Sequence, residues 1–362
     1  MRYLLLVLFI LNSVAYGCGK SADNPTATNP GLNGGGQTVK RRPASIGIIG
    51  DTANTVKSTT GGLVLMGGST DVASAFKWMI GKSGGGDAVV IRASGTDAYN
   101  SYINGLGSLN SVETLLINSR ELANNDTVAY IIRNAEMVFI AGGDQSDYMR
   151  YWKGTKVDQA LNYLLKEKKA PVGGTSAGCA ILGGFYYSGE TGGVTSVEAL
   201  ENPYNANVTL YKKDFLEAPF LEHVITDQHY LARNREGRSL VFLGRILKDW
   251  NIEAKAIAVD ERVAVCIDEN GLAKVHADYS ATRPYSYAYF IVADKNKQPE
   301  IFTANTKVTW SHQEKALDVY EIMGKENGNG EFNVATFNIS SAKDGNRFWW
   351  SINNGVVVKK AQ

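Results

Sequence analysis

Short apolar runs alternate with segments of helical periodicity after residue 60. Helical spacing of apolar residues occurs over residues 71–82 and 125–135. The apolar runs between and around them occupy residues 61–67, 87–94, 112–118 and 136–144. Runs of this kind suit strands buried on both faces, because helices that connect parallel strands cover both sides of a sheet. The alternation therefore predicts an α/β fold with a mostly parallel sheet flanked by helices.

Glycine-rich or polar loops follow three of these predicted strands. Their sequences are MGGSTD at 66–71, ASGTD at 93–97 and AGGDQSD at 141–147. In open parallel sheets, ligands bind at the carboxyl ends of the strands. We therefore expect these loops to share one rim of the sheet and to surround any functional site.

The stretch APVGGTSAGCAILGG, residues 170–184, follows a helical pattern over 156–170 and contains G-x-S-x-G at 174–178. Such a strand-to-helix turn strains the backbone of its serine, here Ser176, and projects the hydroxyl above the sheet. Backbone amides nearby can then bind an oxyanion, and we expect donors at Ala177 and, from the Gly142–Gly143 loop, at Gly143. The motif alone fits equally well a glycine turn that serves only close helix–strand packing.

A serine nucleophile needs a base, and His229 closes an apparent strand in HVITDQHYLARNREGRSL, residues 223–240. In AKAIAVDERVAVCID, residues 254–268, the triplet Asp260-Glu261-Arg262 interrupts a buried strand and places a carboxylate among apolar residues. A buried carboxylate requires a partner, and a histidine oriented by a carboxylate is the base that a serine nucleophile uses. The chain order of serine, histidine and acid argues against a lipase or esterase, in which the acid precedes the histidine.

Four separated motifs carry a resemblance to a known family. GGTSAGCA, DQHYLARNREGR and AIAVDERVAV, with IAGGDQ before them, resemble the motif series of cyanophycinases. Those enzymes are serine peptidases that share a family with aspartyl dipeptidases and a sheet topology with class I glutamine amidotransferases. The resemblance covers residues 46–324, and several motifs in the right order are more specific than one pentapeptide.

The resemblance implies roles for individual residues. Ser176 would be the nucleophile, His229 the base and Glu261 the orienting acid. The residues implied to line or support the substrate site are Gln145, Asp227, Gln228, Arg233, Arg235 and Arg238. The implied substrate is cyanophycin or a related aspartyl peptide, cleaved to small β-aspartyl dipeptides, and arginines suit such substrates because a guanidinium binds both oxygens of a carboxylate.

The N-terminus has the layout of an export signal. Residues 1–17 combine Arg2, an apolar core from Leu4 to Leu11 and small residues before Cys18, and the run is too short to span a bilayer. The position of Cys18 resembles a bacterial lipobox, which implies a lipid anchor in the cell envelope. Residues 18–45 are polar and lack periodicity, so they read as a flexible tether.

The composition of the chain limits the classes of partner and cofactor that we expect. The chain has 37 Lys and Arg against 36 Asp and Glu, with no basic block, so nucleic acid is not expected as a partner. The four histidines show no metal-ligand spacing, and Cys179 and Cys266 lie in apolar settings typical of buried free thiols. We predict no metal and no cofactor, contact with the membrane only through the lipid, and leave a homodimer open.

The C-terminal part is rich in predicted strands. Runs at 283–295 and 315–324 finish the α/β domain assigned to residues 46–324, and residues 325–362 form an added β element that turns at Asn353-Asn354-Gly355. Two hypotheses of different class follow for the whole chain. One is an exported serine peptidase of cyanophycinase type, or an exopeptidase for other acidic dipeptides; the other is a catalytically inactive lipoprotein that binds peptides.

Overall fold

The computed structural model describes residues 42–278 and 286–362. The predicted signal peptide, Cys18 and all but the last four residues of the predicted tether lie outside these ranges. The described chain begins a few residues before the expected boundary at 46. Arg42 forms a bidentate pair with the buried Glu113, and the first strand starts at Ser45.

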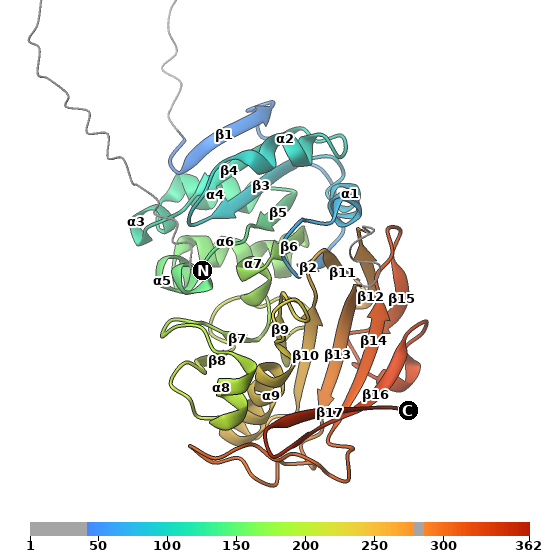
Figure 1. Ribbon diagram of the computed structural model, residues 1–362. Coiled ribbons are helices and arrows are strands. Elements are labelled where there is room, and N and C mark those ends of the chain that lie inside the picture. Colours follow the sequence, from blue (N-terminus) through green and yellow to red (C-terminus); the bar gives the residue numbers. More distant parts are fainter. Residues whose placement is uncertain (1–41, 279–285) are drawn as a thin grey trace, which may run out of the picture. The chain divides into compact units, whose positions relative to one another are not determined.

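Nine strands form the first sheet, in the order β1-β4-β3-β5-β6-β2-β11-β12-β15 (Figure 1). Their bounds are β1 Ser45–Gly50, β2 Gly62–Met66, β3 Asp87–Arg92, β4 Ser111–Leu116, β5 Met137–Ile140, β6 Pro171–Thr175, β11 Val263–Asp268, β12 Leu272–Ala277 and β15 Asn329–Asn333. The pairs within β4-β3-β5-β6-β2 are parallel, whereas β1, β11, β12 and β15 pair antiparallel with their neighbours. The expected parallel sheet is therefore the centre of a larger mixed one.

Helices cover both faces of these parallel strands, as the sequence predicts. The helices in this half are α1 Ala73–Lys82, α2 Ala98–Asn104, α3 Arg120–Ala123, α4 Asp126–Asn134, α5 Gln145–Trp152, α6 Lys156–Tyr163 with the π-helical turn Leu164–Lys168, and α7 Ala177–Ala180. Alternate residues of each strand point to opposite faces. Val64 therefore belongs to the same buried cluster as Phe76 of α1, while Leu63 belongs to the cluster that includes Leu161 of α6.

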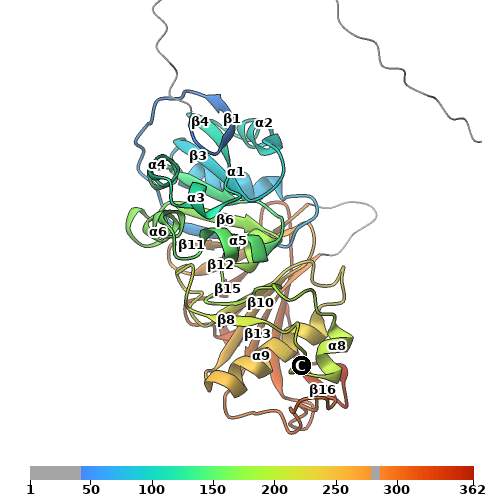
Figure 2. The ribbon, with the colours of Figure 1, turned by 90° about the vertical axis from the view of Figure 1, so that its left-hand side faces the viewer.

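A second sheet, which the sequence analysis does not anticipate, has the order β17-β16-β14-β13-β10-β9-β7-β8. Its strands are β7 Phe185–Tyr187, β8 Leu210–Lys212, β9 Val224–Asp227, β10 Ala254–Val259, β13 Tyr287–Ala293, β14 Leu317–Met323, β16 Asn346–Asn353 and β17 Val356–Ala361. The other helices are α8 Ser196–Glu201, α9 Glu236–Trp250 and a 3-10 turn at Ile339–Ser341. Figure 2 shows α9 lying over β10 and β13.

The two sheets pack together through one apolar core. Val265 of β11 and Phe290 of β13 belong to the same buried cluster, so the space between the sheets is filled by side chains. The other face of the second sheet packs on α8 and α9, where Ala256 of β10 meets Leu243. Sheets and helices together make a mixed α/β fold.

The C-terminal strands are part of both sheets. β15 pairs with β12 of the first sheet, and β16 pairs with β14 of the second. The hairpin between β16 and β17 turns at Asn354 and Gly355, both with positive φ, which is the conformation that a two-residue hairpin turn with the right twist requires. The C-terminal region is thus strand-rich as predicted, and it shares its hydrogen bonds with the main sheets.

Candidate active site

Ser176 lies on the sharp turn between β6 and α7. Its φ is 52° and its ψ is −118°, a backbone conformation that L-residues adopt only under strain. The flanking glycines permit the turn, because a Cβ on Gly174 would lie 2.4 Å from the carbonyl oxygen of Gly178, and one on Gly178 would lie 2.1 Å from that of Ile140. The glycines therefore do serve close packing, and the same packing holds the serine in its strained geometry.

His229 reaches Ser176 from the loop after β9. Its Nε2 lies 2.8 Å from Ser176 Oγ, and its backbone N–H donates to the carbonyl of Gly67 at 2.8 Å. The expected strand ends two residues earlier, at Asp227, and His229 has a positive φ of 48°. His223, which precedes β9, is outside the site, since its ring lies 3.3 Å from Lys213 Nζ on the surface.

Glu261 completes the line of side chains from the turn between β10 and β11. Its Oε1 lies 2.8 Å from His229 Nδ1, and the two side chains are 18% and 7% exposed, respectively. A carboxylate at Nδ1 places the proton there and leaves Nε2 free to accept the proton of Ser176. Asp260 points elsewhere, where its carboxylate accepts the backbone N–H of Ala232 at 3.1 Å. The predicted interrupted strand is in fact two strands, one in each sheet.

Burial lowers the pKa of His229 below its ordinary value, and the nearby Arg233 and Arg235 lower it further, while the hydrogen bond to Glu261 raises it. The net direction is downward. The imidazole therefore stays neutral to lower pH than a free histidine, and only the neutral form can take a proton from a hydroxyl.

The loop after β2 supports this arrangement, and the sequence analysis did not single it out beyond placing it on the rim. A Cβ on Gly68 would lie 2.4 Å from Cε1 of His229, so only glycine lets the imidazole pass so close. The carbonyl of Gly68 accepts the N–H of Arg262, next to Glu261, at 3.1 Å. The pair of glycines in MGGSTD was the available signal, because adjacent glycines after a buried strand mark close backbone approach.

The expected oxyanion donors lie on the proposed rim. Ala177 is the first residue of α7, so its amide has no acceptor within the helix. Gly142 is the glycine of the second loop that adjoins the nucleophile, since a Cβ on it would lie 3.4 Å from Ser176 Cβ. Gly143, the predicted second donor, is exposed, and a Cβ on it would lie 2.8 Å from Tyr148 Oη.

Comparison with known proteins adds the family to this geometry. The sequence model of Peptidase family S51 matches residues 63–275, which include Ser176, His229 and Glu261. The chain belongs to Peptidase family S51. The match ends before β13, so the C-terminal strands lie beyond it.

Among relatives of this S51 chain is a cyanophycinase of Synechococcus elongatus, 24% identical over 208 residues. That match spans 56% of the present chain and 59% of the relative. The cyanophycinase of Trichormus variabilis is 25% identical over 171 residues, spanning 47% of this chain and 52% of the relative. A solved peptidase from an acI-B1 Actinobacterium shares 16% identity at a TM-score of 0.45, covering 61% of this chain and 89% of that one. The chain thus matches little more than half the length of its curated relatives.

Two of the residues expected to line or support the substrate site form a buried internal ion pair in this S51 fold. Asp227, at the end of β9, accepts hydrogen bonds from Arg238 Nε at 3.1 Å and from Nη2, and it also pairs with Ser239. Asp227 and Arg238 are 2% and 5% exposed. Of the two roles implied, lining or supporting the substrate site, burial favours support, in which the pair ties β9 to α9.

Gln228 and Arg235 also support the histidine loop. Gln228 is buried, and its side-chain amide donates to Thr226 Oγ1 at 3.3 Å. Arg235 Nη1 donates to the carbonyl of Gln228 at 2.8 Å, and burial lowers the pKa of Arg235 to about 10. At 4% exposure, Gln228 suits the supporting role among those that the resemblance implies. It holds the segment that carries His229.

Gln145 and Arg233 are the expected substrate residues that remain accessible. Gln145 begins α5, and its side-chain nitrogen packs against Gly189. Arg233 is exposed, and its guanidinium has no ion-pair or hydrogen-bond partner within residues 42–278 and 286–362. An exposed guanidinium that acts electrostatically on the His229 imidazole is suited to bind a carboxylate.

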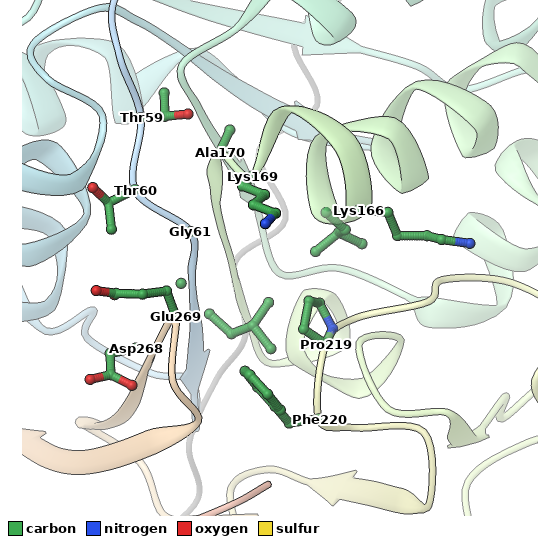
Figure 3. Close-up of a pocket in the computed structure, with 13 residues that line it drawn as sticks. Thr59, Thr60, Gly61, Lys166, Lys169, Ala170, Pro219, Phe220, Asp268 and Glu269 are labelled. Atoms are coloured by element: carbon green, nitrogen blue, oxygen red, sulfur yellow. The ribbon is translucent and has the colours of Figure 1, made fainter.

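Other features lie away from these side chains. A pocket of about 540 Å³ is lined by residues such as Leu63, Lys169 and Phe220 (Figure 3). It adjoins the first residues of β2 and β6, at the opposite end of the strands from Ser176, so it does not hold the reacting atoms. Cys179 and Cys266 are buried free thiols as expected.

The described ranges contain neither a candidate metal cluster nor a candidate membrane-spanning helix. There, no group of three or more His, Cys, Asp or Glu side chains is arranged to hold a metal ion. No helix of the described ranges has the length and apolar character to cross a bilayer.

Proposed function

We propose that this S51 chain is a serine-type peptidase in which Ser176, His229 and Glu261 act as a catalytic triad. One observation carries the proposal: a strained serine hydroxyl, an imidazole and a carboxylate, drawn from three distant segments, form a continuous hydrogen-bonded line. A protein that only bound peptides would need no such line, because a triad serves to activate a hydroxyl.

The reaction begins when Ser176 Oγ attacks the carbonyl carbon of the scissile amide. His229 Nε2 takes the hydroxyl proton as the new C–O bond forms, and the carbonyl π electrons move to the oxygen. The oxyanion reforms the carbonyl and breaks the C–N bond, while Nε2–H protonates the leaving amine. A water molecule then attacks the acyl-enzyme by the same route, with His229 as base, and releases the acid.

Glu261 and the backbone amides assist by electrostatics. The Glu261 carboxylate fixes the tautomer of His229 and stabilises the imidazolium that forms. The amide of Ala177 would donate to the oxyanion, and the loop of Gly142 and Gly143 would supply the second donor. Because α7 has only four residues, this stabilisation rests on individual N–H groups more than on the helix dipole.

The proposed substrates are cyanophycin or related aspartyl peptides, and the products are small β-aspartyl dipeptides. The names of the curated relatives support this choice. The exposed guanidinium of Arg233 beside His229 is suited to the carboxylates that such substrates present.

Incubation with cyanophycin, β-aspartyl dipeptides and α-linked acidic dipeptides, followed by mass analysis of the products, tests the proposal. We expect cleavage by the wild-type chain and none by Ser176→Ala. Cleavage of acidic dipeptides alone would redirect the specificity to an exopeptidase. Tight peptide binding without cleavage, equal in both proteins, would overturn the peptidase in favour of the peptide-binding lipoprotein.

The proposal places the enzyme outside the cytoplasm, anchored to the bacterial cell envelope by a lipid on Cys18. It rests on the apolar core at residues 4–11 and on the cysteine that follows small residues. Growth with a labelled fatty acid, followed by mass analysis of the N-terminus, should find a diacylated Cys18. A Cys18→Ser chain that still carries the label would contradict the anchor.

A further inference from the structure

The loop between β2 and α1, residues 67–72, contacts His229 and the residues next to Glu261 and Ser176. Gly67 accepts the N–H of His229, and Gly68 packs on its ring. The carbonyl of Gly68 accepts the N–H of Arg262, beside Glu261. The remaining contact is that of Asp71 with Thr175, the residue directly before Ser176. A segment in this position can set the geometry of the whole site.

Asp71 lies near two hydroxyl groups and is hydrogen-bonded to one of them. Tyr99 Oη donates to its Oδ2 at 2.5 Å, and the Thr175 hydroxyl lies close enough to lower the pKa of the carboxyl. Burial has the larger effect and leaves that pKa raised above its ordinary value. Tyr99 comes from α2, so the carboxyl joins a helix, a loop and the last residue of β6.

Two buried polar atoms in this cluster lack hydrogen-bond partners among the described residues: Asp71 Oδ1 and Thr175 Oγ1. A buried polar atom that is left unpaired destabilises the fold, because it has lost its hydrogen bonds to water. If the Thr175 hydroxyl donated to Asp71 Oδ1, one hydrogen bond would satisfy both atoms. Catalytic hydrogen bonds are often long in the free enzyme and tighten when substrate binds.

We infer that Asp71 is a positioning residue, which accepts the Thr175 hydroxyl and so fixes the backbone of Ser176 for attack. The inference rests on the proposed function, because it concerns the reactivity of the same serine. Tyr99 orients the carboxyl from its far side. The cluster would help to hold the strained φ of Ser176, since a strained conformation persists only where the surrounding contacts enforce it.

Two variants test the contact: Thr175→Val, which removes the hydroxyl at constant size, and Asp71→Ala. The rate at which a fluorophosphonate labels Ser176 reports the nucleophile without any choice of peptide. Misplacing the serine should slow labelling about 10- to 100-fold in each variant. In peptide hydrolysis, kcat should fall by a similar factor while KM stays within about twofold, since only attack is impaired.

Further variants separate positioning from general stability. Thr175→Ser restores the hydroxyl and should restore the labelling rate. The double variant should be no slower than the slower single one, because both changes break one contact. Thr114→Val is the matched control, since Thr114 is a buried strand threonine that donates to Asn100 at 2.6 Å, away from Ser176. It should lower stability and leave labelling unchanged.

Wild-type labelling by Thr175→Val, or effects that multiply in the double variant, would overturn the inference while leaving the peptidase intact. If Ser176 of the wild-type chain is inert to the reagent, the proposed function fails instead. In that case, hydrogen exchange tests the positioning role of Asp71 and Thr175 independently of the reagent. Faster exchange over residues 171–182 in Thr175→Val but not in Thr114→Val supports a fixed turn, and equal exchange in all three proteins contradicts it.

Discussion

At the scale of single residues, His229 carries the pH dependence of the proposed reaction. Burial, with help from two arginines, lowers the pKa of the imidazole, so the neutral base persists to lower pH than in a free histidine. Activity should therefore be lost as pH falls through a midpoint below about 6.5. Arg233→Gln removes one of the lowering charges and should move this midpoint upward, which the pH profile of kcat/KM measures.

Arg133→Gln is the control for that shift, because this exposed arginine stacks on Tyr163 away from the triad. Its profile should match that of the wild-type chain. An unchanged midpoint in Arg233→Gln would show that the guanidinium does not act on His229.

The residues of the proposed triad could be singled out from the sequence because each carries a local signal or belongs to a motif. Ser176 lies in G-x-S-x-G, and Glu261 interrupts an apolar run. Asp227 and Arg238 show the limit, since a motif says that a residue is needed but not whether it touches substrate. Their pairing depends on how β9 and α9 approach each other, and Asp71 depends on a loop path that has no periodicity.

At the scale of elements, the buried pair of Asp227 and Arg238 ties β9 to α9. Removing Arg238 leaves the buried Asp227 carboxylate with only the longer, 3.7 Å ion pair to Arg235, so Arg238→Met should lower the free energy of unfolding, by up to about 3–5 kcal/mol. Urea denaturation measures this loss. In Asp227→Asn/Arg238→Met, which removes both charges of this pair, part of the stability should return, although Arg235 loses its ion pair with Asp227.

Breaking the exposed pair of Lys156 and Asp126, by Lys156→Met, is the control and should cost no more than about 1 kcal/mol.

The stabilisation by the buried pair of Asp227 and Arg238 should depend on pH. Burial raises the pKa of Asp227, but Arg238 outweighs this and the net pKa is lowered. Its stabilisation is therefore complete above the unfolded pKa, about 3.9, and is lost as pH falls through the lower folded value. Equal stability of wild type and Arg238→Met at neutral pH would refute the assignment.

The strands and helices of the parallel half followed from periodicity because each is buried by its neighbours along the chain. The separation of β10 from β11 did not, since residues 254–268 have the pattern of one strand with an interruption at Asp260-Glu261-Arg262. The chain changes sheets at Asp260 and Glu261, and only long-range pairing with β13 and β2 reveals the change. That break is what brings Glu261 to His229.

At the scale of the whole molecule, the C-terminal strands belong to the same folding unit as the candidate site. Phe332 of β15 and Trp350 of β16 are each 1% exposed and lie in the two main cores. A chain truncated after Gly324 loses both side chains and should not fold stably, because removing one large core side chain alone costs about 3–5 kcal/mol. Circular dichroism and thermal unfolding of the truncated chain measure this. A truncated protein with the wild-type Tm would instead support a separate C-terminal element.

The second sheet was the part of the architecture least accessible to sequence reasoning. Its strands come from residues 185–361 and pair mostly antiparallel across long separations, so no short segment encodes them. Its consequence for the site is large, because the sheet supplies the β9 loop with His229 and one side of the turn with Glu261.

The most direct test of the triad is the covalent labelling of Ser176 by a fluorophosphonate, followed by intact and peptide mass spectrometry. We predict one adduct per wild-type chain, located on Ser176. His229→Ala should slow its formation by at least about two orders of magnitude, since general base catalysis is lost, while the fold persists by circular dichroism. Labelling of His229→Ala at the wild-type rate, or a wild-type chain that stays unlabelled, would contradict the account.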